Sequence, residues 1–207
     1  MTSQSQHQPA ILPASEWILR FAPLVPAGAR VLDVACGSGR HGRLFLNSGC
    51  DVTLIDRDLS GVADLADTAT LIAHDLESGP NGADHSWPFS PENPSVSPKS
   101  HFDAVIVTNY LHRPLFPHLC AALRPDGLLL YETFAHGNER FGRPRNPDHL
   151  LAPGELLALT APLHVIAYET GLVVRGGESR VIARIIARKG EGVSALPFLS
   201  QSTSPMS

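Results

Sequence analysis

Short apolar runs alternate with polar, turn-rich stretches along the chain, and this alternation predicts buried strands separated by helices. The first run, Val31–Ala35, is nearly continuous, as expected of a parallel strand covered on both faces. Six further strands are predicted at Asp51–Asp56, Thr70–Asp75, Phe102–Thr108, Gly127–Thr133, His164–Val174 and Arg180–Lys189. The last two are joined by a short stretch around Gly176 and Gly177, so they must be antiparallel. The pattern predicts an α/β fold.

Helical patterns fill the intervals between these runs. They are predicted at Glu16–Phe21, Arg40–Asn47, Asp58–Asp67, Phe116–Leu123 and from Pro153 through Leu157. Ser15 is a suitable N-cap for the first helix, and Gly49 is a suitable C-cap for the second. Arg124–Gly127 is predicted to form a turn before the fifth strand.

The chain divides into one domain with loose ends. Residues 1–13 are expected to be a flexible N-terminus, 14–189 the domain, and 190–207 a disordered tail. Within the domain, residues 78–101 form a long insertion rich in proline and serine. We expect Trp87 and Phe89, its only apolar island, to anchor this loop on the body of the domain.

Composition narrows the classes of function. The chain has 207 residues, 43% of them hydrophobic, and a net charge of −4, so it lacks the basic surplus of proteins that grip nucleic acid. Three cysteines predict reduced thiols and no metal site. No run is long enough for a membrane helix, and the N-terminus does not resemble a signal peptide, so the expected location is cytoplasmic. Composition does not indicate the oligomeric state.

The most informative stretch is VLDVACGSGRHG, from Val31 to Gly42. A buried strand, a glycine turn and a helix form the first unit of nucleotide-binding α/β folds. The G-x-G-x-x-G match alone also fits a dinucleotide, but Asp33 would repel a pyrophosphate at the helix N-terminus. Asp33 suits a ligand that carries an ammonium group; the alternative is that it only braces the turn.

Two more carboxylates are predicted at strand ends. Asp56 ends the second strand about 20 residues after the glycine turn, where such folds hold ribose hydroxyls, and Arg57 follows it. Asp75 ends the third strand and is followed by Leu76. Each of these acids also has a simpler interpretation. Asp56 or Asp58 could cap the following helix, and Asp75 could be an ordinary acidic residue at the surface. Three acids at three successive strand ends are more specific than any one of them.

The residues D-V-A-C-G-S-G resemble motif I of the class I S-adenosylmethionine-dependent methyltransferases. The resemblance implies a Rossmann-like, doubly wound, seven-stranded sheet of order 3-2-1-4-5-7-6 with strand 7 antiparallel. It implies S-adenosyl-L-methionine as cofactor. The cofactor-binding residues would be Asp33, Gly37 and Gly39 for the methionyl part, Asp56 for the ribose, and Asp75 with Leu76 for the adenine. Ala35, Arg57 and Asn109 would also contact the cofactor. The run from Phe141 to Leu156 resembles bacterial relatives of the tellurite-resistance-type methyltransferases.

In this family the transferred methyl group faces the loop after strand four, here Asn109–Pro114. Asn109, Tyr110, His112 and Arg113 are therefore candidates for orienting the acceptor, and His112 serves either as a general base or as a helix cap. The segment 134–151 is expected to cap the acceptor site; the alternative is a solvated loop. The residues that favour a cap are Tyr131, Glu132, Phe134, Phe141, Arg143, Arg145 and His149. In the same family a helix before the first strand often closes over the cofactor, so Trp17 and Phe21 suit either that lid or plain packing.

The acceptor itself is predicted only as a class. No NPPY-type signature follows strand four, where the sequence reads TNYLHRP, and this disfavours an adenine or glutamine target. A small molecule is the favoured acceptor. A protein or RNA acceptor, a non-catalytic cofactor-binding or scaffold domain, and a dinucleotide-dependent oxidoreductase remain as alternatives.

Overall fold

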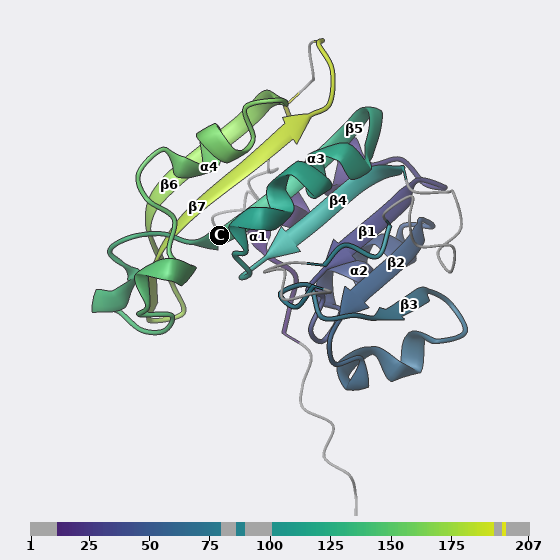
Figure 1. Cartoon of the computed structure of the whole chain (residues 1–207), viewed down its shortest axis with the longest axis horizontal. Coiled ribbons are helices and arrows are strands. Elements are labelled where there is room, and N and C mark those ends of the chain that lie inside the picture. Colours follow the sequence, from purple (N-terminus) through teal and green to yellow (C-terminus); the bar gives the residue numbers. More distant parts are fainter. Residues whose placement is uncertain (1–11, 80–85, 90–100, 193–195, 198–207) are drawn as a thin grey trace, which may run out of the picture.

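The computed structural model describes residues 12–79, 86–89, 101–192 and 196–197, and these form one seven-stranded sheet (Figure 1). Its strands are β1 (Arg30–Val34), β2 (Asp51–Asp56), β3 (Thr70–Ala73), β4 (Phe102–Thr108), β5 (Leu123–Phe134), β6 (His164–Arg175) and β7 (Glu178–Arg188). The order is β3-β2-β1-β4-β5-β7-β6, and β7 runs antiparallel to both β5 and β6. The predicted fold class, strand order and antiparallel last strand are confirmed.

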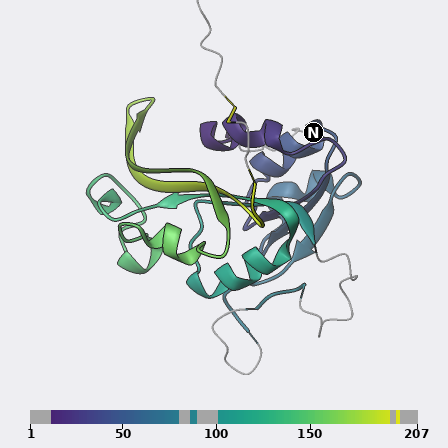
Figure 2. The same cartoon turned by 90° about the horizontal axis from the view of Figure 1, so that it is seen from above.

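Helices cover both faces of the sheet. They are α1 (Glu16–Phe21), α2 (Arg40–Asn47), α3 (Phe116–Ala122) and α4 (Glu155–Leu159). Seen along the sheet in Figure 2, α1 and α2 lie on one side while α3 and α4 lie on the other. Successive β1 residues therefore enter different cores: Val31 packs with Trp17 of α1, and Leu32 packs with Phe116 of α3. Burial on both faces explains why β1 has a continuous apolar run rather than an alternating one.

Helix α1 is part of the core. Ser15 caps it by accepting the N–H of Trp17 at 3.2 Å, as its sequence predicts. Trp17 and Phe21 are fully buried, and the guanidinium of Arg184 lies 4.7 Å from the Trp17 ring. Packing against the sheet, one of the two predicted roles for these aromatic residues, is the one that the structure shows.

Several predicted elements differ from the observed ones in their end residues, and three of them differ in a way that local structure explains. The helix predicted at 58–67 is a 3-10 helix, η2 (Ser60–Leu65), in which a Cβ on Gly61 would lie 2.9 Å from the Gly37 carbonyl oxygen. This close approach holds the segment tightly against the glycine turn. Strand β3 ends at Ala73, before a tight turn at Asp75. Strand β5 begins at Leu123, because the predicted turn at 124–127 is a bulge between the pairs Phe102–Leu123 and Ala104–Leu128.

The two aromatic residues of the insertion are anchored as predicted. Trp87 packs on Phe89 with ring centroids 5.4 Å apart and stacks on His118, and Phe89 packs on Phe102 of β4. Most of the other residues of the insertion lie outside the described residues. So do residues 1–11 and most of 190–207, for which the sequence predicts a flexible terminus and a disordered tail. Among the described residues, no helix is both long and apolar enough to cross a membrane.

Candidate functional site

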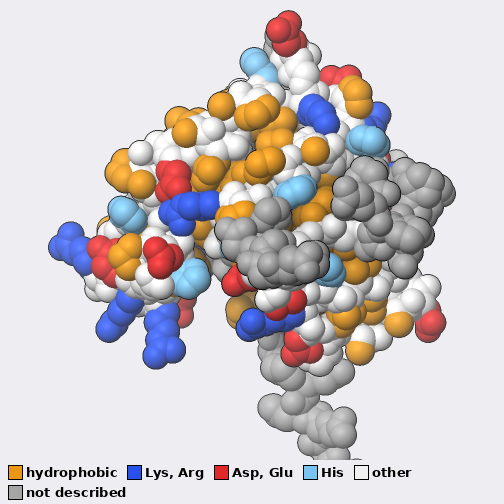
Figure 3. Space-filling model, in the orientation of Figure 1, with side chains coloured by type: hydrophobic (Ala, Val, Ile, Leu, Met, Phe, Trp, Pro, Cys, Tyr) orange, Lys and Arg blue, Asp and Glu red, His pale blue; other side chains and the backbone are white. Residues whose placement is uncertain are grey.

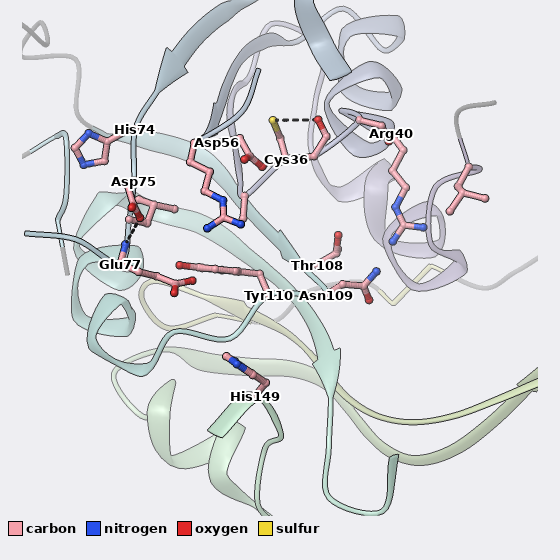
Figure 4. A pocket seen from close by; sticks show the side chains of 16 residues that line it. Cys36, Arg40, Asp56, His74, Asp75, Glu77, Thr108, Asn109, Tyr110 and His149 are labelled. Atoms are coloured by element: carbon pink, nitrogen blue, oxygen red, sulfur yellow. Dashed lines mark hydrogen bonds between the residues drawn. The ribbon is translucent and has the colours of Figure 1, made fainter. Parts of the chain in front are cut away.

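A cavity of about 610 Å³ lies at the carboxyl ends of β1, β2, β3 and β4. This is the edge at which open α/β sheets bind ligands, and the volume is typical of small-molecule sites. Figure 4 shows the side chains that line it. They are Leu12, Ala35, Cys36, Gly37, Ser38, Arg40, Asp56, Arg57, His74, Asp75, Leu76, Glu77, Thr108, Asn109, Tyr110 and His149.

The glycine turn presents bare backbone to this cavity. Gly37 has a φ of +54°, and a Cβ placed on it would meet nothing within 4 Å, so the space in front of it is open. Ala35 and Asn109, at the ends of β1 and β4, also have positive φ values, of 52° and 56°. Such backbone is costly for a residue other than glycine and is found mainly at functional sites. The turn therefore forms a cradle for a ligand that approaches the backbone closely.

The later glycines of the motif serve packing instead. A Cβ on Gly39 would lie 2.5 Å from Val62 Cγ1, and a Cβ on Gly42 would lie 2.3 Å from Leu54 Cδ2. Gly39 does not line the cavity, although the sequence predicts it as a ligand contact. Of the three glycines in the G-x-G-x-x-G motif, Gly37 therefore faces open space. Gly39 and Gly42 are needed because α2 packs closely against Val62 and Leu54.

Asp33 lies behind the cavity wall. Its side chain is 1% exposed and does not line the cavity, and Oδ2 accepts the backbone N–H of Gly42 at 2.9 Å. Burial raises the pKa of Asp33 to about 7, against the opposing effect of that hydrogen bond. The geometry thus shows the bracing role that the sequence left open, because the carboxylate is directed into the first turn of α2. Its predicted contact with a ligand ammonium group stays a prediction.

Asp56 stands at the end of β2 where the sequence predicts a ribose contact. Its Oδ2 accepts the N–H of Gly37 at 2.9 Å, and its Oδ1 accepts the N–H of Asp58 at 3.1 Å. A carboxylate has about four acceptor positions, so two remain for ligand hydroxyls. Asp58 in turn accepts the N–H of Ser60, so Asp58 is the residue that caps the next turn. The side chain of Asp56 both fixes the glycine turn and faces the cavity.

A second acidic group follows β3. Asp75 accepts the N–H of Glu77 at 3.0 Å, and this hydrogen bond lowers the pKa of Asp75. Leu76 is buried beside it and gives the cavity an apolar wall. The ring of Tyr110 points toward Asp75 and Glu77 in Figure 4. Its hydroxyl is buried and makes no hydrogen bond within the described residues, and burial together with the nearby Glu77 carboxylate raises its pKa.

The opposite end of the cavity is cationic. In Figure 4, Arg40, Thr108 and Asn109 lie at the end away from His74 and Asp75. Arg40 is half-buried; one of its NH groups donates to the Pro13 carbonyl at 3.3 Å, and it forms no ion pair within the described part of the chain. Desolvation lowers its pKa, although a guanidinium stays charged.

Three predicted acceptor contacts, His112, Arg113 and Arg143, do not line the cavity. The guanidinium of Arg113 instead holds neighbouring segments together. It pairs with Glu155 at 2.5 Å and donates to the Asp148 and Leu150 carbonyls. For His112 and Arg143, contact with an acceptor stays a prediction.

The segment 134–151 contributes one side chain to the cavity, His149. Its buried residue Asn138 ties the segment to β7, because Oδ1 accepts the N–H of Val181 and Nδ2 donates to the Pro144 carbonyl. Arg140, Arg143 and Arg145 are exposed. Figure 3 shows basic side chains gathered over this part of the surface, at lower left, where Figure 1 places the chain between β5 and α4.

Sequence reasoning missed several lining residues, and one signal was available for some of them. Arg40 comes directly after the glycine turn, so it occupies the first turn of α2, beside the cavity. Thr108 is the last residue of β4, one position before the loop that was singled out. Cys36 and Glu77 lie next to predicted contacts. Cys36 is a free, buried thiol, as predicted, and burial raises its pKa.

A cofactor with a nucleoside and an amino-acid part fits these groups. The open cradle at Gly37 accepts close approach of a ligand, Tyr110 has an unsatisfied buried hydroxyl, and the carboxylates of Asp56 and Asp75 stand away from Arg40 in the cavity. Among the described residues, no three His, Cys, Asp or Glu side chains are grouped to hold a metal ion.

Comparison with known proteins identifies the family. The family model described as "Methyltransferase domain" matches residues 6–157, which is most of the chain. This chain therefore belongs to the methyltransferase-domain family, and the resemblance of its first motif is confirmed. The ubiquinone biosynthesis O-methyltransferase of Xanthomonas axonopodis pv. citri (strain 306) is 37% identical over 117 residues, covering 54% of this chain and 46% of that protein.

Solved structures share the fold. TehB from Haemophilus influenzae matches with a TM-score of 0.64 at 16% identity over 87% of this chain and 64% of that one. The 1,6-didemethyltoxoflavin-N1-methyltransferase of Burkholderia thailandensis matches with a TM-score of 0.56 at 21% identity over 84% and 76%. Its structure holds 1,6-didemethyltoxoflavin and S-adenosylhomocysteine. At these identities the likeness concerns the fold, and this chain spans about half of the curated relative and under two thirds of TehB.

Proposed function

We propose that this chain is an S-adenosylmethionine-dependent methyltransferase that acts on a small-molecule acceptor. The observation that carries the proposal is the layout of the cavity. Asp56 and Asp75 follow consecutive strands at one end, and Arg40 stands at the other. A ligand with ribose hydroxyls and an adenine amino group at one end and a carboxylate at the other matches this distribution of acceptors and donors.

The nucleoside part of the cofactor would lie at the end of the cavity that carries Asp56 and Asp75. Asp56 would accept hydrogen bonds from the ribose hydroxyls while it holds the glycine turn through the Gly37 N–H. Asp75 would accept from the adenine amino group, with Leu76 against the ring. The hydroxyl of Tyr110 would gain in this ligand the hydrogen-bond partner that it lacks among the described residues. Arg57 lines the same end and stays a candidate contact.

The acceptor would enter beside Asn109 and His149. The cofactor supplies an activated methyl group on a sulfonium, so the protein must mainly align the acceptor and exclude water. The imidazole of His149 projects into the cavity from the segment after β5 (Figure 4) and replaces His112 as the histidine proposed to contact the acceptor. A soft acceptor such as a thiol needs no strong base, which agrees with the lack of a buried acid–base pair facing the cavity among the described residues.

The small-molecule class is supported by the names of similar proteins. The Xanthomonas relative is named for ubiquinone biosynthesis, and the Burkholderia structure contains a small heterocyclic ligand. The net charge of −4 also disfavours a nucleic acid acceptor.

A labelled transfer assay tests the proposal. The protein is incubated with methyl-labelled S-adenosylmethionine and bacterial extract, which is then separated by ultrafiltration into small molecules and macromolecules. Enzyme-dependent label in the small-molecule fraction supports the proposal. Label confined to protein or RNA favours the macromolecular alternative. Binding of S-adenosylhomocysteine without transfer to either fraction would indicate a non-catalytic cofactor-binding domain.

A further inference from the structure

His41 has no place in the predicted site, yet it connects three elements around the cavity. It lies in the first turn of α2 and is 2% exposed. Its Nε2 is 3.1 Å from the backbone nitrogen of Ser15, at the start of α1, and its Nδ1 is 3.2 Å from Thr108 Oγ1, at the end of β4. Thr108 lines the cavity. A buried ring with both nitrogens engaged is a fixed part of the structure rather than a free base.

The partners determine where the ring carries its proton. A backbone N–H can only donate, so Nε2 must accept from Ser15 and must be unprotonated. Burial, with the nearby Arg40 charge as a smaller cause, lowers the pKa of His41 to about 3, so the ring is neutral at physiological pH. A neutral imidazole carries one proton, which is then on Nδ1, and Nδ1 donates to Thr108 Oγ1.

This arrangement also fixes the role of the Thr108 hydroxyl. Since Oγ1 accepts from His41, its own proton is left to donate elsewhere. Among the described residues, Thr108 Oγ1 has no other hydrogen-bond partner, and Thr108 lines the cavity at the end where Figure 4 shows Arg40. A hydroxyl donor and a guanidinium without an ion pair therefore stand together at one end of the cavity.

We propose that His41 is a positioning residue that makes the Thr108 hydroxyl a hydrogen-bond donor to a ligand carboxylate, which it recognises together with Arg40. Charge-assisted hydrogen bonds of this kind are the strong ones, and a planar guanidinium suits a carboxylate. The carboxylate belongs either to the methionyl part of the cofactor or to the acceptor. The inference rests on the proposed function only for the identity of that ligand.

The first experiment examines the ring in the unmodified protein. Long-range nitrogen–proton NMR spectra distinguish the two neutral tautomers from the imidazolium, and the His41 signals are assigned by their loss in His41→Gln. We expect the neutral Nδ1–H form between pH 5.5 and 8, with or without ligand. An Nε2–H tautomer, or an imidazolium that appears near pH 6, overturns the proposal. This result does not depend on whether the protein binds any adenosyl ligand.

The second experiment uses calorimetry with S-adenosylhomocysteine and with methylthioadenosine, which lacks the amino-acid part. Thr108→Val removes the donor with little change in shape, and Thr108→Ser retains it. A carboxylate from the cofactor predicts that Thr108→Val weakens S-adenosylhomocysteine about tenfold or more, leaves methylthioadenosine within twofold, and is rescued by Thr108→Ser. The matching change at the guanidinium, Arg40→Gln, is expected to act in the same direction.

A carboxylate from the acceptor predicts a different result. S-adenosylhomocysteine affinity is then unchanged in Thr108→Val, but benzoate, titrated into protein saturated with S-adenosylhomocysteine, binds the wild type and not the variant. If neither affinity changes, the proposal is overturned. If the wild type binds neither adenosyl ligand, the proposed function fails, while the NMR experiment still tests the role of His41.

Discussion

The turn between β1 and α2 and the segment between β5 and α4 are both polar, and the sequence assigns both to the same site, yet they contribute to it very differently. Five of the residues 35–40 line the cavity, whereas the segment 134–151 contributes only His149 to the lining. In the first region, Ser38 and Arg40 line the cavity directly after the end of β1. In the second, Asn138 is buried and ties the segment to β7, while Arg140, Arg143 and Arg145 lie at the surface.

The difference teaches which sequence signals carry positional information. Asp56 ends β2 and Asp75 follows β3, and the two strands are parallel neighbours with a fixed register. A residue at the end of such a strand lies at the carboxyl edge of the sheet, so its position can be predicted from the sequence. The prediction for the segment after β5 rests on its composition of aromatic and basic residues. Composition does not indicate which of these side chains faces the cavity. Substitutions in the two regions and around the cavity test this contrast.

The first prediction concerns Asp56. Asp56→Ala removes a proposed ligand contact and the acceptor for the Gly37 N–H, so S-adenosylhomocysteine should bind about 100-fold more weakly, since each hydrogen bond to a charged group contributes roughly 1.5–3 kcal/mol. Asp58→Ala is the matched control, because it removes only the acceptor for Ser60. Titration calorimetry of both variants checks this. Equal affinities would remove Asp56 from the ligand site.

The second prediction concerns the buried carboxyl of Asp33, whose pKa is raised to about 7. A raised folded-state pKa means that this group's contribution to stability is full below pH 4 and is lost as the pH rises through 7. His41 has the opposite sign: its lowered pKa makes its contribution full above pH 6.5 and lost on acidification. Asp33→Asn removes the pH dependence of the free energy of unfolding that Asp33 causes and leaves the one that His41 causes.

Wild type and Asp33→Asn are therefore compared by urea denaturation at pH 5, 6, 7 and 8. The free energy of unfolding of the wild type relative to the variant should fall by about 2 kcal/mol across this range, because one pKa unit corresponds to about 1.4 kcal/mol. A constant difference would show that Asp33 is ionised throughout and that its environment is more polar than the described contacts indicate.

The third prediction compares Gly42, in the helix that follows the first region, with Gly142 in the second region. Gly42→Ala places a Cβ against the fully buried Leu54, and overpacking of this kind costs about 1–3 kcal/mol. Gly142→Ala places a Cβ where nothing lies within 4 Å, so its effect on the free energy of unfolding should stay within about 0.5 kcal/mol. Thermal denaturation of the two variants checks the contrast. Similar melting temperatures would mean that α2 shifts to accommodate the methyl group.

The fourth prediction compares His149 with Arg143 once an acceptor is known. His149→Ala should lower kcat/KM about tenfold, corresponding to about 1.4 kcal/mol, and leave S-adenosylhomocysteine affinity unchanged. Arg143→Ala should change neither by more than about twofold, because its side chain does not line the cavity. Steady-state kinetics with both variants decides between them, and a larger loss for Arg143 would show that the segment moves over the acceptor.

Much of the fold was predictable because its signals are repeated along the chain. Apolar runs flanked by turn residues give the strands, and the short connection around Gly176 requires antiparallel pairing of β6 and β7. The site was predictable where a residue ends a strand. It was not predictable where a side chain's direction depends on tertiary contacts: Asp33 lies inside the apolar run, and the sequence alone does not show that its carboxylate accepts the N–H of Gly42. The tautomer of His41 likewise depends on Ser15 and Thr108, 26 and 67 residues away.

The most direct test of the account is a calorimetric titration of the wild-type chain with S-adenosylhomocysteine and, separately, with NAD. The account predicts saturable one-to-one binding of S-adenosylhomocysteine and no measurable heat from NAD, because the cavity places carboxylates at its nucleoside end and a single guanidinium at the other. Binding of NAD with no binding of S-adenosylhomocysteine would contradict it.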